Sequence, residues 1–348
     1  MKKFGGLRLY KNKPTIIAEA GVNHDCDMRK AYKLISDAKI CGVEAVKFQT
    51  YKSNDLVIKN SPAYWDLTKE KTKTQRKLFD KYDKFNFKEY LKIIEQCKRK
   101  NITFLTTLFD IQSIPLYSKY LPLFKIASAD ITNVPLLKAI SSKKKPILLS
   151  TGASQLDEIK FALKTLKLPK EQVCIMHCVL NYPTKDENAN LMFIETLKKK
   201  FNKYIIGYSD HVSPDNNLTS LEVAWSYGAQ IIEKHFTLDK TLDGPDHSLS
   251  SDPEEFNKLV NSTKIVFSAK GIMKKKPVED INLITQIRRS IFAGCDISSG
   301  TLLEKKMLSI TRPIKGIEPK HMKKIIGMKA VKNISKGDPI QWSDIEMI

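Results

Sequence analysis

Residues 15–49 read TIIAEAGVNHDCDMRKAYKLISDAKICGVEAVKFQ, and this stretch decides the fold. It begins with an apolar, β-branched run at 15–19, continues through a helical pattern at 28–41 and ends in a second strand-like run at 43–49. A strand, a helix and a second strand in this order are typical of the βαβ unit of a parallel sheet.

The same alternation recurs along the chain. Most of the strand-like runs start about 20 to 30 residues after the one before, as a strand, a crossover helix and two loops require. These runs predict a closed (β/α)8 TIM barrel rather than an open doubly wound sheet, since no G-x-G-x-x-G motif follows the first strand. The long polar connection at 51–83 is predicted to be an active-site loop. The expected strands are 15–19, 43–49, 102–107, 123–127, 146–151, 173–178, 204–208 and 230–235.

The pattern changes near residue 270. We predict a barrel domain at 1–270, a linker at 271–288 and a small β-rich domain at 289–348. Within this last domain, Ile297-Ser298-Ser299-Gly300 is echoed by Ile334-Ser335-Lys336-Gly337, which is a weak internal repeat. A domain of this size buries little surface by itself, so we expect it to dock on another surface.

Composition narrows the class of protein. The chain carries 59 Lys and Arg against 38 Asp and Glu, a formal net charge of +21. Because only seven of these are arginine and the lysines are dispersed, we interpret them as solvated surface residues and expect no nucleic-acid partner. No long apolar window or signal-like N-terminus is present, which predicts a cytoplasmic protein without a membrane partner. The six scattered cysteines are expected to be reduced and mostly buried.

Polar residues gather where the predicted strands end, which is where TIM barrels build their active sites. His211 and His235 follow consecutive strands, so their imidazoles can converge on a catalytic divalent metal, with no thiolate placed to bias the choice. Hydrogen-bonded core histidines are the alternative. The other polar strand-end residues include Asn23, His24, Thr106, Thr107, Thr151, His177 and Tyr182.

Two lysines at strand ends predict an anion site. Lys47 and Lys125, with Ser150 and the amides around Gly152, suit a small, multiply anionic molecule such as a phosphorylated carboxylate. A Schiff-base lysine is the rival function, and lysines that extend to solvent are the structural alternative. Carboxylates are candidates for acid/base chemistry or for binding sugar hydroxyls, namely Glu19, Asp210, Glu233 and Asp246.

The motifs, taken in order, resemble those of bacterial sialic acid (N-acetylneuraminate) synthases, a group that includes legionaminate and pseudaminate synthases. The tail from about Ser290, with Thr311-Arg312-Pro313, resembles the antifreeze-like (SAF) domain of that family. The matching motifs are EAGVNH at 19–24, VKFQT at 46–50, KIAS at 125–128, LSTG at 149–152, HC at 177–178, YPT at 182–184, GYSDH at 207–211, EKHFT at 233–237 and GPD at 244–246.

The resemblance implies a metal-dependent condensation of phosphoenolpyruvate with an open-chain N-acetyl hexosamine. The default sugar is N-acetylmannosamine, a 2,4-diacetamido hexose is the alternative, and the products are a nine-carbon α-keto acid and phosphate. The expected metal is Mn²⁺, with Mg²⁺ or Co²⁺ as alternatives, and the expected assembly is a domain-swapped homodimer. The implied roles are phosphoenolpyruvate binding by Lys47, Lys125, Ser128, Ser150 and Ser209, metal binding by His211 and His235, proton transfer by Glu19, and sugar binding by Gln49, Asp130, Tyr182, Asp246 and, from the partner subunit, Arg312.

Departures from the family pattern fall on the sugar side. Strand 3 ends in Thr106-Thr107-Leu108-Phe109, Asp130 stands where Glu is frequent, and Asn181 is displaced by one residue. Reaction type is therefore better defined than sugar identity. A Schiff-base pyruvate aldolase and a non-catalytic carbohydrate-binding protein remain as other classes.

Overall fold

The computed structural model describes residues 2–65, 67–68, 70–215, 219–270 and 280–348. The chain divides into two compact units, 1–271 and 272–348, each of which has its own core. Residues 271–279 of the expected linker lie outside the described residues, and α11 (Ile281–Ile287) forms within the rest of the expected linker span.

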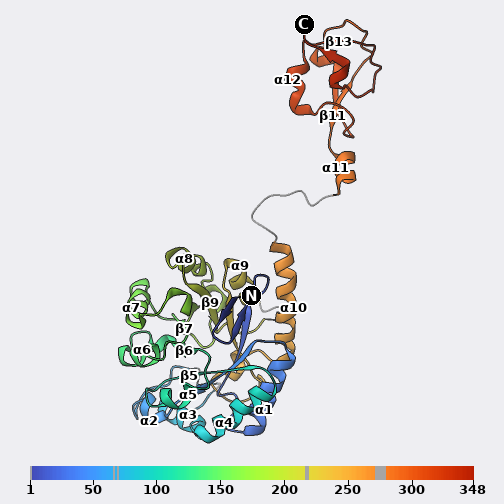
Figure 1. Cartoon of the computed structure of the whole chain (residues 1–348). Coiled ribbons are helices and arrows are strands. Elements are labelled where there is room, and N and C mark those ends of the chain that lie inside the picture. Colours follow the sequence, from blue (N-terminus) through green and yellow to red (C-terminus); the bar gives the residue numbers. More distant parts are fainter. Residues whose placement is uncertain (1, 66, 69, 216–218, 271–279) are drawn as a thin grey trace. The chain divides into compact units, whose positions relative to one another are not determined.

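The first unit is a closed barrel of parallel strands surrounded by helices, which confirms the predicted (β/α)8 fold (Figure 1). The strands follow one another around the barrel in sequence order, and β10 pairs with β3 to close it. Each expected strand is present with its ends shifted by at most two residues. The barrel strands are β3 (Thr15–Gly21), β4 (Ala45–Thr50), β5 (Thr103–Leu108), β6 (Phe124–Ile126), β7 (Ile147–Ser150), β8 (Val173–Cys178), β9 (Ile205–Asp210) and β10 (Ile231–His235).

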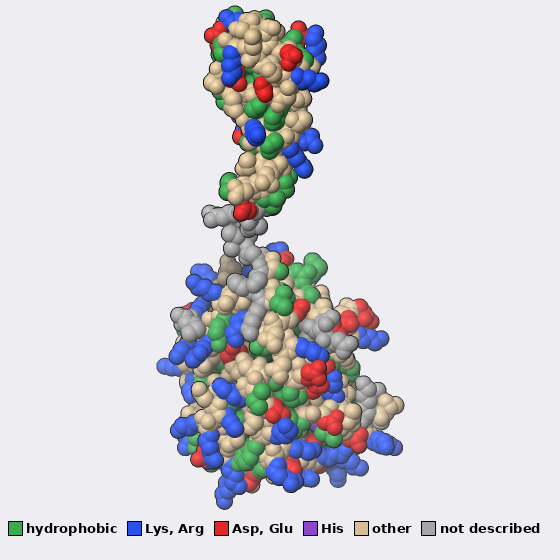
Figure 2. All heavy atoms as spheres, turned by 90° about the vertical axis from the view of Figure 1, so that its right-hand side faces the viewer, with side chains coloured by type: hydrophobic (Ala, Val, Ile, Leu, Met, Phe, Trp, Pro, Cys, Tyr) green, Lys and Arg blue, Asp and Glu red, His purple; other side chains and the backbone are tan. Residues whose placement is uncertain are grey.

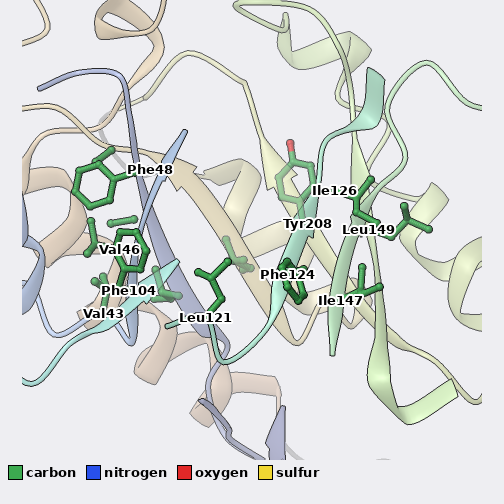
Figure 3. Close-up of a cluster of buried hydrophobic side chains, with 14 of the residues drawn as sticks. Val43, Val46, Phe48, Phe104, Leu121, Phe124, Ile126, Ile147, Leu149 and Tyr208 are labelled. Atoms are coloured by element: carbon green, nitrogen blue, oxygen red, sulfur yellow. The ribbon is translucent and has the colours of Figure 1, made fainter. Parts of the chain in front are cut away.

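Side chains alternate along each barrel strand between the interior and the helical layer. On β3, Ile17 and Glu19 face the interior, whereas Ile16 and Ala18 belong to the large hydrophobic cluster under the helices. Figure 3 shows part of this outer cluster. Inside the barrel, most strands carry apolar residues near the N-terminal end and polar residues near the C-terminal end, so the interior has an apolar lower part and a polar mouth.

Helices fill the connections, and several begin with a side-chain cap. Asn86 and Glu89 form a capping box at the start of α4, and Asp27 accepts a hydrogen bond from the Arg29 backbone N–H at the start of α1. The helices of this unit are α1 (Met28–Ile40), α2 (Ser53–Leu56), α3 (Gln75–Tyr82), α4 (Phe87–Arg99), α5 (Ser113–Tyr117), α6 (Val134–Ser141), α7 (Leu156–Leu166), α8 (Phe193–Lys200), α9 (Thr219–Tyr227) and α10 (Pro253–Lys270).

An N-terminal hairpin, which the sequence pattern does not predict, closes the lower end of the barrel. Strands β1 (Lys2–Phe4) and β2 (Leu7–Leu9) pair antiparallel, and Phe4, Leu7 and Leu9 are buried in the cluster of inward-facing strand residues. Three-residue strands carry too little periodicity to be recognised in a sequence.

The second unit is a small β-rich domain, as predicted. Strand β11 (Ser290–Ala293) pairs with β12 (Leu308–Thr311), and β13 (Lys329–Ala330) pairs with β14 (Ile345–Glu346); α12 spans Met322–Ile325. The two echoed segments pair with each other, since Ile297 and Ile334 exchange backbone hydrogen bonds at 2.9 and 2.8 Å. Gly300 and Gly337 both adopt positive φ, at 88° and 92°, so the repeat forms two equivalent turns.

The remaining composition-based expectations concern the charged surface residues, the cysteines and membrane-spanning helices. On the face of the barrel unit seen in Figure 2, Lys and Arg side chains are dispersed among other residues rather than gathered in one patch. All six cysteines are free thiols, of which Cys295 is exposed. Within the described part of the chain, no helix has the length and apolar character needed to span a bilayer.

Candidate active site

A cavity of about 810 Å³ opens at the C-terminal ends of the barrel strands. Residues of the loop between β4 and α4 line it, so the segment 51–83 that was predicted to be an active-site loop borders this cavity. The predicted site residues that line the cavity are Glu19, Lys47, Gln49, Lys125, Ser128, Ser150, Tyr182, Ser209, His211, His235 and Asp246.

Four buried charged groups form a cluster at the base of this cavity. Lys125 Nζ donates to both carboxylate oxygens of Glu233, at 2.7 and 2.9 Å. Lys47 Nζ lies 2.8 Å from Glu19 Oε2 and 3.6 Å from Glu233 Oε1. The two expected anion-binding lysines therefore already face protein carboxylates.

The pKa values in this cluster reflect burial opposed by close opposite charges. Burial would raise the pKa of Glu233, but Lys125 and Lys47 outweigh it and lower the pKa to about 2. Burial also dominates at Glu19, where it raises the pKa of the carboxyl despite Lys47. At Lys47 burial is outweighed by Glu19 and Glu233, which raise its pKa, whereas burial lowers the pKa of Lys125. Glu19 is thus the carboxyl of the cluster more readily protonated.

Three serine hydroxyl groups line the same cavity as the two lysines. Ser150 Oγ is buried and has no hydrogen-bond partner among the described residues. Ser128 Oγ accepts from the Gly152 backbone N–H at 2.8 Å, and its side chain also interacts with the Cys178 thiol. Ser209 Oγ donates to Glu233 Oε1 at 3.0 Å. A buried hydroxyl without a partner in a polar cavity indicates a place for a bound ligand.

His211 and His235 lie side by side, with ring centroids 5.3 Å apart. His211 Nδ1 is 2.6 Å from the Val179 carbonyl oxygen, a contact that fixes the ring and leaves Nε2 for another partner. His235 Nδ1 is buried and makes no hydrogen bond within the described part of the chain, although Asp246 Oδ2 lies 3.3 Å away. Burial would raise the pKa of Asp246, but His235 outweighs it and lowers the pKa.

Sequence reasoning missed a thiol beside this pair. Cys178 Sγ lies 3.7 Å from His211 Nδ1 and lines the cavity, which corrects the expectation that no thiolate is placed to bias the choice of metal. Burial raises the pKa of this thiol, but the neighbouring His211 outweighs it, and the net shift is downward. Alternation from Met176 could have placed Cys178 inside the barrel. Among the described residues, no group of three or more His, Cys, Asp or Glu side chains is arranged to hold a metal ion.

The loop that carries Asp246 is held from two sides. Gly244 has φ 153°, and a Cβ there would lie 2.8 Å from the His247 ring and 3.1 Å from the Tyr82 hydroxyl. Ser250 Oγ donates to the Asp246 carbonyl, and Asn23 Nδ2 donates to Ser250 Oγ at 3.0 Å. Asn23 therefore positions the loop rather than lining the cavity.

Other strand-end residues are structural. His24 is buried against Phe85, with ring centroids 4.7 Å apart, and burial lowers its pKa to about 4. His177 bonds to the Ala189 carbonyl, and Asp210 forms a buried ion pair with Lys234 at 2.6 Å. Because Ser209 faces inward on β9, Asp210 faces outward, so its candidacy as a cavity carboxylate was wrong.

One predicted sugar-binding residue of the barrel unit does not line the cavity, and another belongs to the second unit. Asp130 is not among its lining residues, and its carboxylate accepts a hydrogen bond from Asn133 Nδ2 at 3.0 Å. Arg312 belongs to the second unit, where it is exposed.

Comparison with known proteins identifies the family. The NeuB family model matches residues 34–275, which is more than half of the chain. The chain belongs to the NeuB family. The SAF domain model matches residues 288–346, so this NeuB-family chain combines a TIM barrel with a SAF domain, as the motifs suggested.

Relatives of the NeuB-family chain extend over nearly its whole length. It is 38% identical to an uncharacterised protein of Methanocaldococcus jannaschii, over 99% of this chain and 98% of the relative. It is 36% identical to the N,N'-diacetyllegionaminic acid synthase of Legionella pneumophila, over 99% of both. A crystal structure of the N-acetylneuraminic acid synthetase of Leptospira borgpetersenii superposes with a TM-score of 0.70 at 34% identity, covering 79% of this chain and 92% of that one. These similarities support an enzyme of the sialic acid synthase type.

Proposed function

We propose that the protein condenses phosphoenolpyruvate with the open-chain form of an N-acetylated hexose. In this reaction C3 of phosphoenolpyruvate forms a bond with the aldehyde carbon of the sugar, which becomes an alcohol. Water adds at C2, and phosphate leaves by cleavage of the C–O bond. The products are a nine-carbon α-keto acid and inorganic phosphate.

The observation that carries the proposal is the buried Ser150 hydroxyl without a partner, beside two lysines in the same cavity. A phosphate or carboxylate oxygen is the acceptor that this hydroxyl lacks, and Ser128 can donate as well. Binding a further anion here requires it to share Lys125 and Lys47 with Glu233 and Glu19.

The histidine pair fits a divalent cation. The buried Nδ1 of His235 lacks a hydrogen bond, and Val179 holds His211 so that its other nitrogen is free. His211 and His235 would hold the cation, and the remaining positions suit water or substrate, as is common for Mn²⁺, Mg²⁺ or Co²⁺. When bound, such a cation would polarise the aldehyde oxygen of the sugar.

Proton transfer is assigned to Glu19. Its raised pKa makes it the carboxyl of the cluster that most readily carries a proton, and Gln49 Nε2 donates to its Oε1 at 3.1 Å. A protonated Glu19 can supply a proton to the oxygen of the aldehyde as the C–C bond forms. Gln49, Tyr182 and Asp246 line the same cavity and can hold sugar hydroxyls.

The acceptor sugar that we favour is a 2,4-diacetamido hexose, because the Legionella relative that matches over the full chain is named as a diacetyllegionaminic acid synthase. N-acetylmannosamine is the alternative. The test is to incubate the protein with phosphoenolpyruvate, Mn²⁺ and each sugar, and to identify products by mass spectrometry.

Phosphoenolpyruvate labelled with ¹⁸O at the bridging oxygen sharpens this experiment, since C–O cleavage delivers the label to phosphate. Ser150→Ala is expected to raise the KM for phosphoenolpyruvate about tenfold, as loss of one hydrogen bond to a charged group implies. Absence of a nine-carbon product with every sugar would refute the proposed reaction.

A Schiff-base pyruvate aldolase is a second candidate, and the lowered pKa of Lys125 favours it. Against it, Lys125 is held by both oxygens of an ionised carboxylate. Borohydride treatment in the presence of pyruvate decides between the two. Labelling of Lys125 or Lys47 would support the aldolase, whereas phosphate release that a chelator abolishes supports the condensation.

A further inference from the structure

One side of the cavity is apolar and takes no part in the chemistry proposed above. Tyr51 follows β4, Phe109 follows β5, Leu56 ends α2, Val57 follows it, and Phe79 lies on α3. We call these five residues the apolar wall. The Tyr51 ring contacts Phe79 and Phe109 edge-on, with centroids 5.3 and 6.1 Å apart.

The segments that carry the apolar wall are fixed to one another. The Ser53 backbone N–H donates to Asp83 Oδ2 at 2.9 Å, and the Ser53 hydroxyl donates to Asp80 Oδ1 at 2.5 Å. Lys52 forms an ion pair with Asp83 at 2.6 Å. These contacts tie the start of α2 to the end of α3, so the wall is formed without a bound ligand.

Helix α3 presents one continuous face to the cavity. Gln75, Phe79 and Tyr82 all line it, at the spacing that places residues on the same side of a helix. Phe79 is the central residue of this face and packs against Tyr51. Helix α3 thus contributes one residue of the wall, and the remaining wall residues come from α2 and from the segments that follow β4 and β5.

The chemistry of the wall differs from that of the cavity base. A sugar hydroxyl placed against Leu56, Val57 and Phe79 would lose water without gaining a hydrogen bond, which disfavours binding. A methyl group placed there would gain from burial. The wall thus favours sugars whose substituents, on carbons distant from the aldehyde, are apolar rather than hydroxyl groups.

We propose that the apolar wall is the subsite for the methyl-bearing acyl group at C4 of a 2,4-diacetamido hexose. N-acetylmannosamine carries a hydroxyl at C4, so the wall selects against it. This inference rests on the proposed function and assigns the residues that determine its acceptor specificity.

The test compares kcat/KM for the two sugars at saturating phosphoenolpyruvate. Val57→Thr replaces a methyl by a hydroxyl at nearly constant shape, and Leu56→Asn makes a similar change beside it. Both positions are only half-buried, so the fold is expected to persist, which circular dichroism checks. Ile58→Thr is the matched control, because Ile58 is 77% exposed and does not line the cavity.

We expect the wild type to prefer the diacetamido sugar. The ratio of kcat/KM for the diacetamido sugar to that for N-acetylmannosamine should fall about tenfold in the Leu56→Asn/Val57→Thr double variant. Val57→Thr alone should lower this ratio in the same direction. Ile58→Thr should leave the ratio unchanged, and the KM for phosphoenolpyruvate should stay the same in every variant.

An unchanged ratio in the double variant, or a wild type that prefers N-acetylmannosamine, would overturn the subsite while leaving the proposed reaction intact. Absence of product with every sugar would overturn both, so the two failures are distinguishable.

Discussion

Glu233 accepts hydrogen bonds from Lys125 through both carboxylate oxygens, at 2.7 and 2.9 Å, inside a cavity whose sequence motifs predicted an anion site. Both side chains are at most 5% exposed. The carboxylate is a counter-ion for the buried lysine, and it must share that lysine when an anion binds. The charge balance at the base of the cavity is therefore internal to the protein.

Removing one partner of this pair should destabilise the barrel. Lys125→Met leaves Glu233 buried with Lys47 3.6 Å away, and we expect a loss of about 3 kcal/mol in the free energy of unfolding. The double variant Lys125→Met/Glu233→Met should recover most of that loss. Urea-induced unfolding of the barrel unit measures the free energy of unfolding of both variants. As a control, Lys33→Met breaks an exposed pair with Asp37 and should cost less than about 1 kcal/mol. Additive losses in the double variant would contradict the prediction.

The histidine pair should be required for metal binding. His211→Ala and His235→Ala are each expected to abolish metal-dependent turnover and to leave the fold intact, because both side chains lie at the mouth and outside the packed layers of the barrel. Mn²⁺ titration by calorimetry or electron paramagnetic resonance is the measurement. His177→Asn is the control and should still bind Mn²⁺, since His177 bonds only to the Ala189 carbonyl among the described contacts. Near wild-type turnover in either alanine variant would remove the assignment.

His24 should make stability depend on pH. Its pKa falls from 6.5 to about 4 on folding because the ring is buried. Between pH 6.5 and pH 4 the unfolded chain binds more protons at this histidine than the folded protein does. The free energy of unfolding is therefore highest above pH 6.5 and decreases by about 3 kcal/mol as the pH falls to 4. His24→Asn keeps an acceptor for the Cys26 N–H and removes the titration. Its unfolding free energy should change less between pH 6.5 and 4 than that of the wild type. Parallel pH profiles for the two proteins would show that His24 contributes nothing.

Arg312 is predicted to complete the site of a partner subunit. Arg312→Ala and His211→Ala homodimers should each be nearly inactive. Subunit exchange between them would produce mixed dimers, each with one site that holds both wild-type residues. At full exchange half of the dimers are mixed and each has one intact site of two, so about a quarter of wild-type activity is expected. If mass spectrometry confirms exchange and no activity returns, Arg312 does not act in a partner's site.

Much of the fold could be predicted from local patterns. Strand and helix periodicities are properties of neighbouring residues, and regular βα spacing leads to a closed parallel barrel. The site followed from the same argument, because the C-terminal ends of all barrel strands meet at one mouth. His211 and His235 could be placed together because they follow consecutive strands, and their ring centroids lie 5.3 Å apart.

Only the tertiary structure decided which of these side chains contact one another and how those contacts shift their pKa values. Lys125 and Glu233 are 108 residues apart in sequence and meet only across the closed barrel, so no local pattern reveals that the lysine already has a counter-ion. The same holds for Cys178 beside His211 and for the apolar wall, whose residues come from separate segments. Periodicity determines which face of a strand a side chain occupies, whereas contact distances and burial, and through them the pKa values, arise only when distant segments pack together.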